Sequence, residues 1–215
     1  NKVTNSASTL ASSLVDLGLE QVNSHYFDTL QIKADAVKTK YEAEKREVNF
    51  HYPDTNTVTI AVNETTTISD LNKIIEIFEV VSGNTVAKIK EISEIQTIPD
   101  TLRRTSEFLT YDVFNKYHSE TELMRYIKRL ERKDLALNHS MISLGSCTMK
   151  LNAASEMLPL SWSNWGNMHP FAPVYQAAGY KVMLNALENQ LTEITGFSGT
   201  SLQPNSGAQG EFAGL

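Results

Sequence analysis

The chain has 215 residues, of which 41% are apolar and 20% are charged, and its formal net charge is −6. This apolar fraction is enough to build a hydrophobic core, which excludes a disordered or fibrous protein. Acidic and basic residues are mixed along the sequence and form no basic stripe that would hold a phosphate backbone, so we expect no nucleic-acid partner.

The sequence has no run of eighteen apolar residues, so we expect no membrane span and no membrane partner. The single cysteine, Cys147, excludes an internal disulfide framework and favours a reducing compartment. We expect no metal, because the five histidines lack the spacing of a metal site. The sequence opens without methionine and closes just after an expected helix start, so we expect a piece of a longer chain. The histidines are His25, His51, His118, His139 and His169.

The first 97 residues mix helical and strand patterns, which predicts a small α+β domain. The expected elements are a helix from Ser8 to Gly18, a strand at 26–32, a polar helix at 35–46, a hairpin with strands at 48–52 and 58–62 and a turn at 53–56, and a helix capped by Ser69 and ended by Gly83.

Residues 98–138 are expected to form a linker and a helix. The periodicity lapses at Pro99, whereas Ser119 and Glu122 have the spacing of a capping box that opens a helix to about Asp134. An irregular stretch follows to about residue 173, and a long helix is expected at 174–195, closed by Gly196.

The segment Ser201–Leu215 predicts a short strand at 201–203, a turn rich in small residues and the start of a helix. Such a turn can hold a phosphate, because small residues let backbone N–H groups approach the anion and the helix dipole favours negative charge. An ordinary turn that starts a helix is the alternative. Spacing alone favours this alternative, since the segment fits neither the Walker nor the dinucleotide fingerprint.

The segment Leu144–Asn152, LGSCTMKLN, is small, polar and unperiodic. Loops of this kind often line binding sites, although composition alone favours an ordinary surface loop. Cys147 would be a nucleophile only with a base nearby, and the sequence places none there, so a buried structural thiol is the better interpretation.

His169 lies in the segment NMHPFAP, where Pro170 and Pro173 stiffen the chain. It is a candidate site residue, and the alternative is a histidine hydrogen-bonded within a packed loop.

Three strings in order, LGSCTMKLN (144–152), HPFAP (169–173) and LQPNSGAQGEFAGL (202–215), resemble the P protein family, the glycine decarboxylases of the glycine cleavage system. The good match covers residues 98–215, whereas residues 1–97 match weakly, where the family has the small C-terminal domain of its first half. The resemblance implies that residues 139–215 begin an α/β fold, the fold-type I PLP-dependent transferase domain of the second half.

The family's reaction implies that glycine forms an imine with pyridoxal 5'-phosphate (PLP), loses carbon dioxide, and passes its aminomethyl group to the lipoyl arm of the H protein. By resemblance, Ser206, Gly207, Ala208 and Gln209 bind the cofactor phosphate, and Ser146, Thr148, Lys150 and His169 line the active site. Lys150 is not the Schiff-base lysine, which the family places beyond Leu215. We therefore expect an inactive piece of a homodimeric enzyme of the bacterial cytoplasm or the mitochondrial matrix.

Two alternatives remain. The first is another fold-type I PLP enzyme, an aminotransferase or amino-acid decarboxylase that shares only the phosphate loop, against which LGSCTMKLN argues. The second is a non-catalytic partner-binding module, against which the intact second-half motifs argue. Tyr111 stands where the family generally has histidine, so we assign this position no role.

Overall fold

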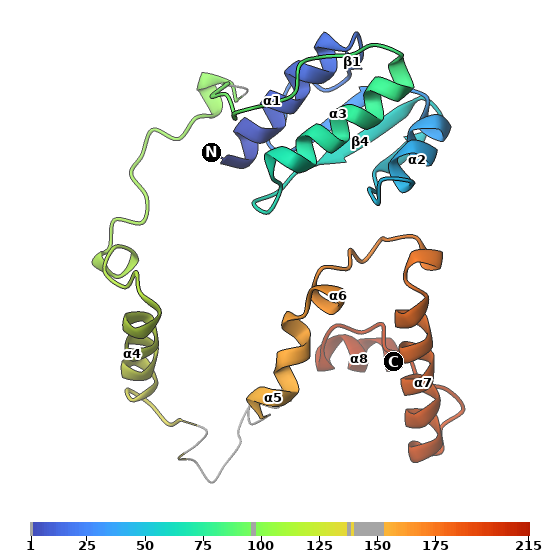
Figure 1. The fold of residues 1–215 in the computed structure, drawn as a ribbon. Helices are drawn as coiled ribbons and strands as arrows, with labels where there is room; N and C mark the ends of the chain where they lie inside the picture. Colours follow the sequence, from blue (N-terminus) through green and yellow to red (C-terminus); the bar gives the residue numbers. More distant parts are fainter. Residues whose placement is uncertain (1, 96–97, 137–138, 140–152) are drawn as a thin grey trace. The chain divides into compact units, whose positions relative to one another are not determined.

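The computed structural model describes residues 2–95, 98–136, 139 and 153–215 (Figure 1). The chain divides by its contacts into two units, Asn1–Phe108 and Leu109–Leu215. Each unit is described by itself.

The first unit is an antiparallel four-stranded sheet with three helices. The strand order is β1-β2-β4-β3, so β3 is an edge strand, and every neighbouring pair is antiparallel. Figure 1 shows α1 and α3 lying across one face of the sheet, with α2 beside α3. The elements are α1 (Lys2–Asp16), β1 (Glu20–Gln21), β2 (Thr29–Lys33), α2 (Ala36–Glu44), β3 (His51–Asp54), β4 (Thr57–Ala61) and α3 (Ile68–Ser82).

The core of this unit lies between the sheet and the helices. Alternate residues of β2 and β4 point into it, because side chains on a strand alternate between faces. The apolar stripes of α1 and α3 meet them, and each fully buried leucine or isoleucine contributes roughly 1.5–3 kcal/mol. The fully buried side chains include Leu10, Leu14, Leu30, Ile32, Val58, Ile60, Leu71, Ile75 and Phe78.

This unit confirms the expected α+β class and the β3–β4 hairpin. The predictions for the hairpin turn and for the cap of α3 were wrong. Pro53 lies within β3 rather than in the turn, which an edge strand tolerates because one side of it needs no ladder donors. The cap of α3 is Thr67 rather than Ser69, since Thr67 has the extended backbone and accepts a hydrogen bond from the Asp70 N–H.

The second unit contains helices and turns among its described residues. It comprises the 3-10 turns η2 (Asp112–Phe114), η3 (Leu158–Ser161) and η4 (Val174–Gln176), and the helices α4 (Glu120–Glu131), α5 (Ala154–Met157), α6 (Ser163–Gly166), α7 (Ala178–Thr195) and α8 (Gly207–Gly214). Ser119 caps α4 and Gly196 ends α7 in the left-handed region at φ 72°, as predicted.

The strand expected at 201–203 is not formed. The Leu202 N–H donates instead to the carboxylate of Glu188 on α7, at 3.3 Å. A strand needs a neighbouring strand to pair with, and the described part of this unit contains none.

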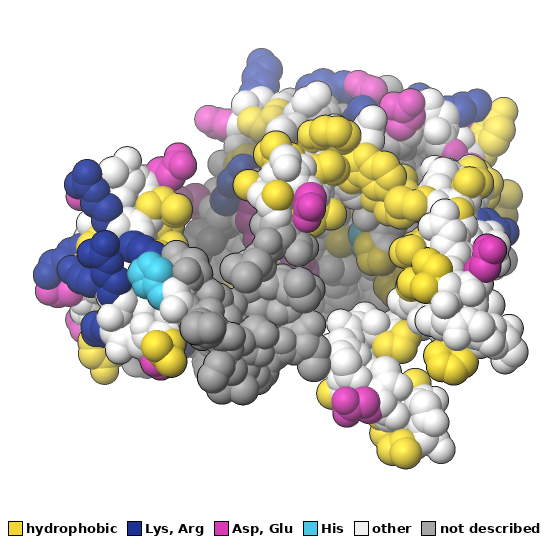
Figure 2. Space-filling view, turned by 90° about the horizontal axis from the view of Figure 1, so that it is seen from below, with side chains coloured by type: hydrophobic (Ala, Val, Ile, Leu, Met, Phe, Trp, Pro, Cys, Tyr) yellow, Lys and Arg dark blue, Asp and Glu magenta, His cyan; other side chains and the backbone are white. Residues whose placement is uncertain are grey.

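Apolar side chains of the second unit remain exposed. Among its described residues, Ala136 is the one buried apolar side chain, whereas Ile194 on α7 is 80% exposed. Figure 2 shows such hydrophobic side chains at the surface. A helix with an apolar stripe normally packs that stripe against another element, and the described residues of this unit leave these stripes uncovered.

Candidate functional site

The turn into α8 carries the residues expected to bind a phosphate. Ser206 is extended, with φ −158° and ψ 170°, and stands at the N-cap position of α8. Its carbonyl accepts the first helical hydrogen bond, from the Gly210 N–H at 3.0 Å. The N–H groups of residues 207–209 precede this bond and therefore lack a carbonyl partner within the helix.

The side chains of this turn add further donors. Gln209 is partly committed, because its Oε1 accepts a hydrogen bond from the Asn205 N–H at 2.7 Å. Its amide nitrogen and the Ser206 hydroxyl have no hydrogen-bond partner among the described residues. The first turn of α8 contains no acidic residue, and the turn is exposed. This set of donors at a helix N-terminus fits the phosphate of a cofactor.

His169 has local contacts. Its Nδ1 accepts a hydrogen bond from the Phe171 N–H at 3.1 Å, and the two rings lie 5.8 Å apart between centroids. The ring is exposed, and Nε2 is the nitrogen left for any further contact. These contacts are those of a histidine hydrogen-bonded within its loop, and they do not join His169 to the turn of α8.

A contact that the sequence did not indicate holds the segment just before His169. The Trp165 ring of α6 meets the Tyr180 ring of α7 edge-on, with centroids 5.4 Å apart, and the Tyr180 hydroxyl donates to the Trp165 carbonyl. Gly166 is needed here, because a Cβ at this position would lie 2.8 Å from the Leu160 carbonyl oxygen. Trp165 and Tyr180 lie 15 residues apart, so periodicity could not pair them.

The other predicted site residues, Ser146, Thr148 and Lys150, lie outside the described residues, as does Cys147. Of the predicted site, the structure therefore describes the turn at 206–209 and His169.

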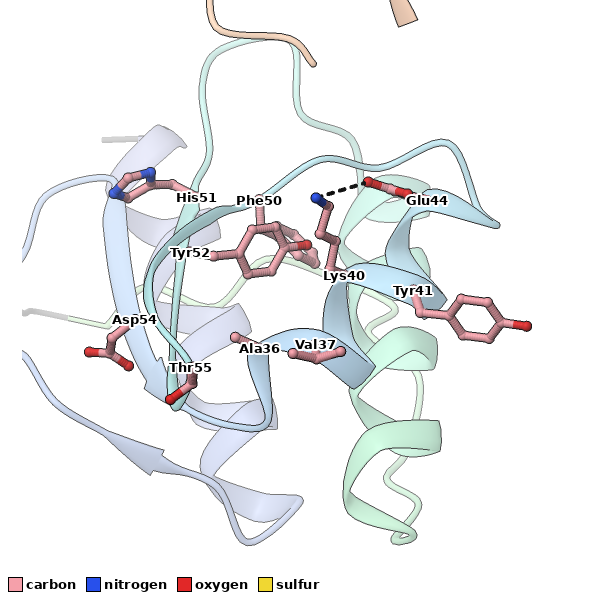
Figure 3. Close-up of a pocket in the computed structure, with 10 residues that line it drawn as sticks. All are labelled: Ala36, Val37, Lys40, Tyr41, Glu44, Phe50, His51, Tyr52, Asp54 and Thr55. Atoms are coloured by element: carbon pink, nitrogen blue, oxygen red, sulfur yellow. Dashed lines mark ion pairs between the residues drawn. The ribbon is translucent and has the colours of Figure 1, made fainter. Parts of the chain in front are cut away.

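The first unit has an open groove of ≈ 720 Å³ between α2 and β3 (Figure 3). Phe50 and Tyr52 form its aromatic wall, and their rings meet edge-on with centroids 6.5 Å apart. Its charges are balanced in part, since Lys40 lies 3.8 Å from the carboxylate of Glu44. The predicted site residues that the structure describes, at 206–209 and His169, do not line the groove.

Two further features, a metal site and a membrane-spanning helix, are not found in the described ranges. No three histidine, cysteine or acidic residues gather there as metal ligands would. No helix of those ranges is long and apolar enough to cross a membrane.

Comparison with known proteins then places the sequence. Residues 1–78 match the family model described as glycine cleavage system P-protein. Over all 215 residues the chain is 66% identical to the glycine dehydrogenase (decarboxylating) of Christiangramia forsetii and 63% identical to that of Flavobacterium johnsoniae. The resemblance to the P-protein family is confirmed. The chain is also 50% identical, over 210 residues, to the enzyme of the same name from Bacteroides fragilis.

These matches correct the expectation for residues 1–97 and show how much of its relatives' length the chain covers. Residues 1–97 were expected to match the P-protein family weakly, yet the family model matches within them and the relatives align over the whole chain. The short strands of a small domain carry few distinctive motifs, so the three strings at 144–215 dominated the prediction. The chain spans 23% of the length of the two P-protein relatives that it matches at 66% and 63%.

Proposed function

We propose that this chain is part of a PLP-dependent glycine decarboxylase, with residues 206–209 as the phosphate anchor of the cofactor. The observation that carries the proposal is the 66% identity, over the whole chain, to a glycine dehydrogenase (decarboxylating). The unpaired donors at the start of α8 support it independently, because they suit the anionic end of PLP.

We also propose the domain organisation that the family implies. Residues 1–97 would form the small domain of the first half, residues 98–138 a linker and helix, and residues 139–215 the start of a fold-type I PLP domain. The exposed apolar face of α7 supports this organisation, since the sheet and helices that would cover it would come from the rest of the protein.

The residues of the chain would bind and orient the cofactor. When bound, PLP supplies a ring that accepts the electron pair freed as carbon dioxide leaves glycine. The N–H groups of residues 207–209 and the Ser206 hydroxyl would hold its phosphate at one end. Fixing this end restricts how the rest of the cofactor turns, which keeps the bond to the leaving carboxylate aligned.

The remaining candidates would line the same site. His169 could contact substrate or cofactor through Nε2, because Nδ1 is already engaged by the Phe171 N–H. Ser146, Thr148 and Lys150 are proposed for the lining loop on the basis of the family's pattern. The partners would be glycine and the lipoylated H protein, which accepts the aminomethyl group, and the whole enzyme would be a homodimer.

The test uses the full-length parent protein with PLP, glycine and the lipoylated H protein. We expect the enzyme to exchange labelled bicarbonate into the carboxyl group of glycine. Ser206→Ala combined with Gln209→Ala should weaken retention of PLP roughly tenfold to a hundredfold, because hydrogen bonds to a charged group are worth about 1.5–3 kcal/mol. Retention is measured from cofactor absorbance after dialysis.

Ser155→Ala is the matched control, since Ser155 is an exposed serine on α5, outside the turn. It should retain PLP as the wild type does. A wild-type enzyme without exchange would exclude glycine decarboxylation and favour another fold-type I enzyme. Unchanged retention in the double variant would exclude the phosphate site.

A further inference from the structure

The helix α4 separates its cations from its apolar side chains. Its basic face includes Arg132, which lies just past the last residue of α4. Among the described residues, this face alone lines a groove of ≈ 460 Å³. These positions are three, four and seven residues apart, which places them on one side of a helix. The basic face consists of Arg125, Lys128, Arg129 and Arg132, and the opposite, apolar face of Leu123, Tyr126, Ile127 and Leu130.

This basic face was not expected from the sequence, where the same cations are interspersed with acidic and apolar residues. The helical repeat gathers them, and Figure 2 shows Lys and Arg side chains grouped over α4 at the left of the view. The prediction from the sequence concerned a basic stripe that would hold a phosphate backbone, and it stays a prediction.

Two of the four cations are available to a partner. Lys128 pairs with Glu131. The guanidinium groups of Arg125 and Arg132 have no hydrogen bond or ion pair with any residue that the structure describes. An exposed cation without a partner contributes little to the stability of this unit beyond its interaction with the helix dipole, so its position on a shared face points to an outside anion.

Arg129 is held in place by aromatic rings. The rings of Tyr117 and Tyr126 stack with centroids 4.3 Å apart, and the Arg129 Cζ lies 5.6 Å and 5.1 Å from the two centroids. The Tyr117 hydroxyl also accepts a hydrogen bond from Arg129. A guanidinium fixed in this way loses less conformational freedom on binding, which favours a recognition surface over a loose solvated face.

The spacing of the cations on the basic face indicates which class of anion it binds. Arg125 and Arg132 are seven residues apart, which is about 10 Å along a helix. A single phosphate needs donors that converge on a point, whereas this row suits carboxylates spread over a protein surface. A nucleic-acid backbone is the alternative partner, which competition with a duplex oligonucleotide distinguishes.

We propose that the basic face of α4 is a docking surface for an acidic face of the lipoylated H protein. This inference rests on the proposed function, which requires that carrier to arrive, react and leave. Charged faces suit such a transient contact, since they raise the rate of encounter more than they slow release. The apolar face of α4 lies opposite, so the rest of the parent protein can cover it while the basic face stays in water.

The test measures steady-state kinetics of the full-length enzyme with glycine, PLP and the lipoylated H protein. Arg125→Glu should raise the KM for the H protein about tenfold, with kcat and the KM for glycine unchanged, because it reverses a charge on the docking face alone. Raising the salt concentration should raise the wild-type KM for the H protein and affect the variant less.

Lys133→Glu is the matched control, with the same change in charge on an exposed lysine next to the basic face but outside it. It should leave the KM for the H protein within about twofold, since a screened charge off the contact contributes little. Arg125→Gln should give a smaller rise than Arg125→Glu and keeps the test valid if the charge reversal impairs folding.

Equal effects of Arg125→Glu and Lys133→Glu, or no effect of either, would overturn the docking surface while leaving the proposed function intact. Tighter binding of a duplex oligonucleotide than of the H protein, lost in Arg125→Glu, would also overturn it. A wild-type enzyme that does not react with the H protein would instead exclude the proposed function, and the docking surface with it.

Discussion

At the scale of single residues, the start of α3 shows how much depends on one cap. The Asp70 carboxylate accepts hydrogen bonds from the Thr67 hydroxyl at 2.7 Å and from the Thr67 N–H at 2.8 Å. The Thr67 hydroxyl accepts in turn from the Asp70 N–H at 3.2 Å. The sequence offers threonines and a serine in succession here, all good capping residues, so only the backbone angles decide which one caps.

These bonds predict a pH dependence. The hydroxyl of Thr67, followed by its backbone N–H, holds the pKa of Asp70 below the ordinary value of 3.8. A lowered folded pKa means that the stabilisation is complete above the unfolded pKa and is lost as pH falls through the folded value. Asp70→Asn should therefore lower the free energy of unfolding by about 0.5 kcal/mol at pH 7, and the difference should shrink below about pH 4.

The measurement is urea unfolding of both proteins from pH 7 to pH 3. Glu64→Gln is the control, because Glu64 is an exposed carboxylate near the cap whose side chain has no hydrogen bond or ion pair with a described residue. A wild-type and Asp70→Asn difference that stayed constant with pH would contradict the role of the carboxylate.

The candidate site was also predictable only in part at this scale. The start of a helix after Ser206 follows from small residues and spacing, and the structure begins α8 at Gly207. The bond from the Asn205 N–H to Gln209 depends on one side-chain conformation, which no sequence pattern specifies. The same is true of the bond that engages His169 with Phe171.

At the scale of elements, helices were easier to predict than strands. The helices α3, α4 and α7 follow from apolar periodicity, because a long amphipathic repeat is distinctive. The helix α1 begins at Lys2 rather than at Ser8, since its first turn buries Thr4 and Ser6 and so lacks an apolar repeat. The strand β1 has two residues, Glu20–Gln21, and exists only by pairing with β2, so local sequence could not indicate it.

The helices α3 and α7 differ in how deeply their isoleucines are buried. The same isoleucine-to-alanine substitution should therefore cost different amounts of stability in the two helices. Ile75 on α3 is 0% exposed, whereas Ile194 on α7 is 80% exposed. Ile75→Ala should lower the free energy of unfolding by about 2–5 kcal/mol, because it leaves a cavity in a closed core. Ile194→Ala should change it by less than about 0.5 kcal/mol in this chain.

Urea unfolding followed by circular dichroism measures both effects. The two variants remove the same atoms from isoleucines on helices, so each serves as the control for the other. Equal losses would mean that α7 is packed in this chain as tightly as α3, contrary to its exposure.

At the scale of the whole molecule, the two units contrast in what holds them. The first unit has a closed core beneath an antiparallel sheet, whereas the second has the one buried apolar side chain of Ala136 among its described residues. Isolated helices of this length are marginal in water, so packing decides whether they persist. The chain spans 23% of the length of the relatives that it matches at 66% and 63%, so we expect the rest of the parent protein to cover the exposed helices of the second unit.

Hydrogen exchange should therefore divide the 215-residue chain in two. Amides of α1, β2, β4 and α3 should exchange slowly, because they open only when the core unfolds, while those of α4 and α7 should exchange within the dead time of a manual experiment. In the full-length protein the amides of α7 should become protected, since its apolar face is then covered. Equal protection of α3 and α7 in the short chain would show that α7 is packed there as stably as α3, contrary to the exposure of its apolar side chains.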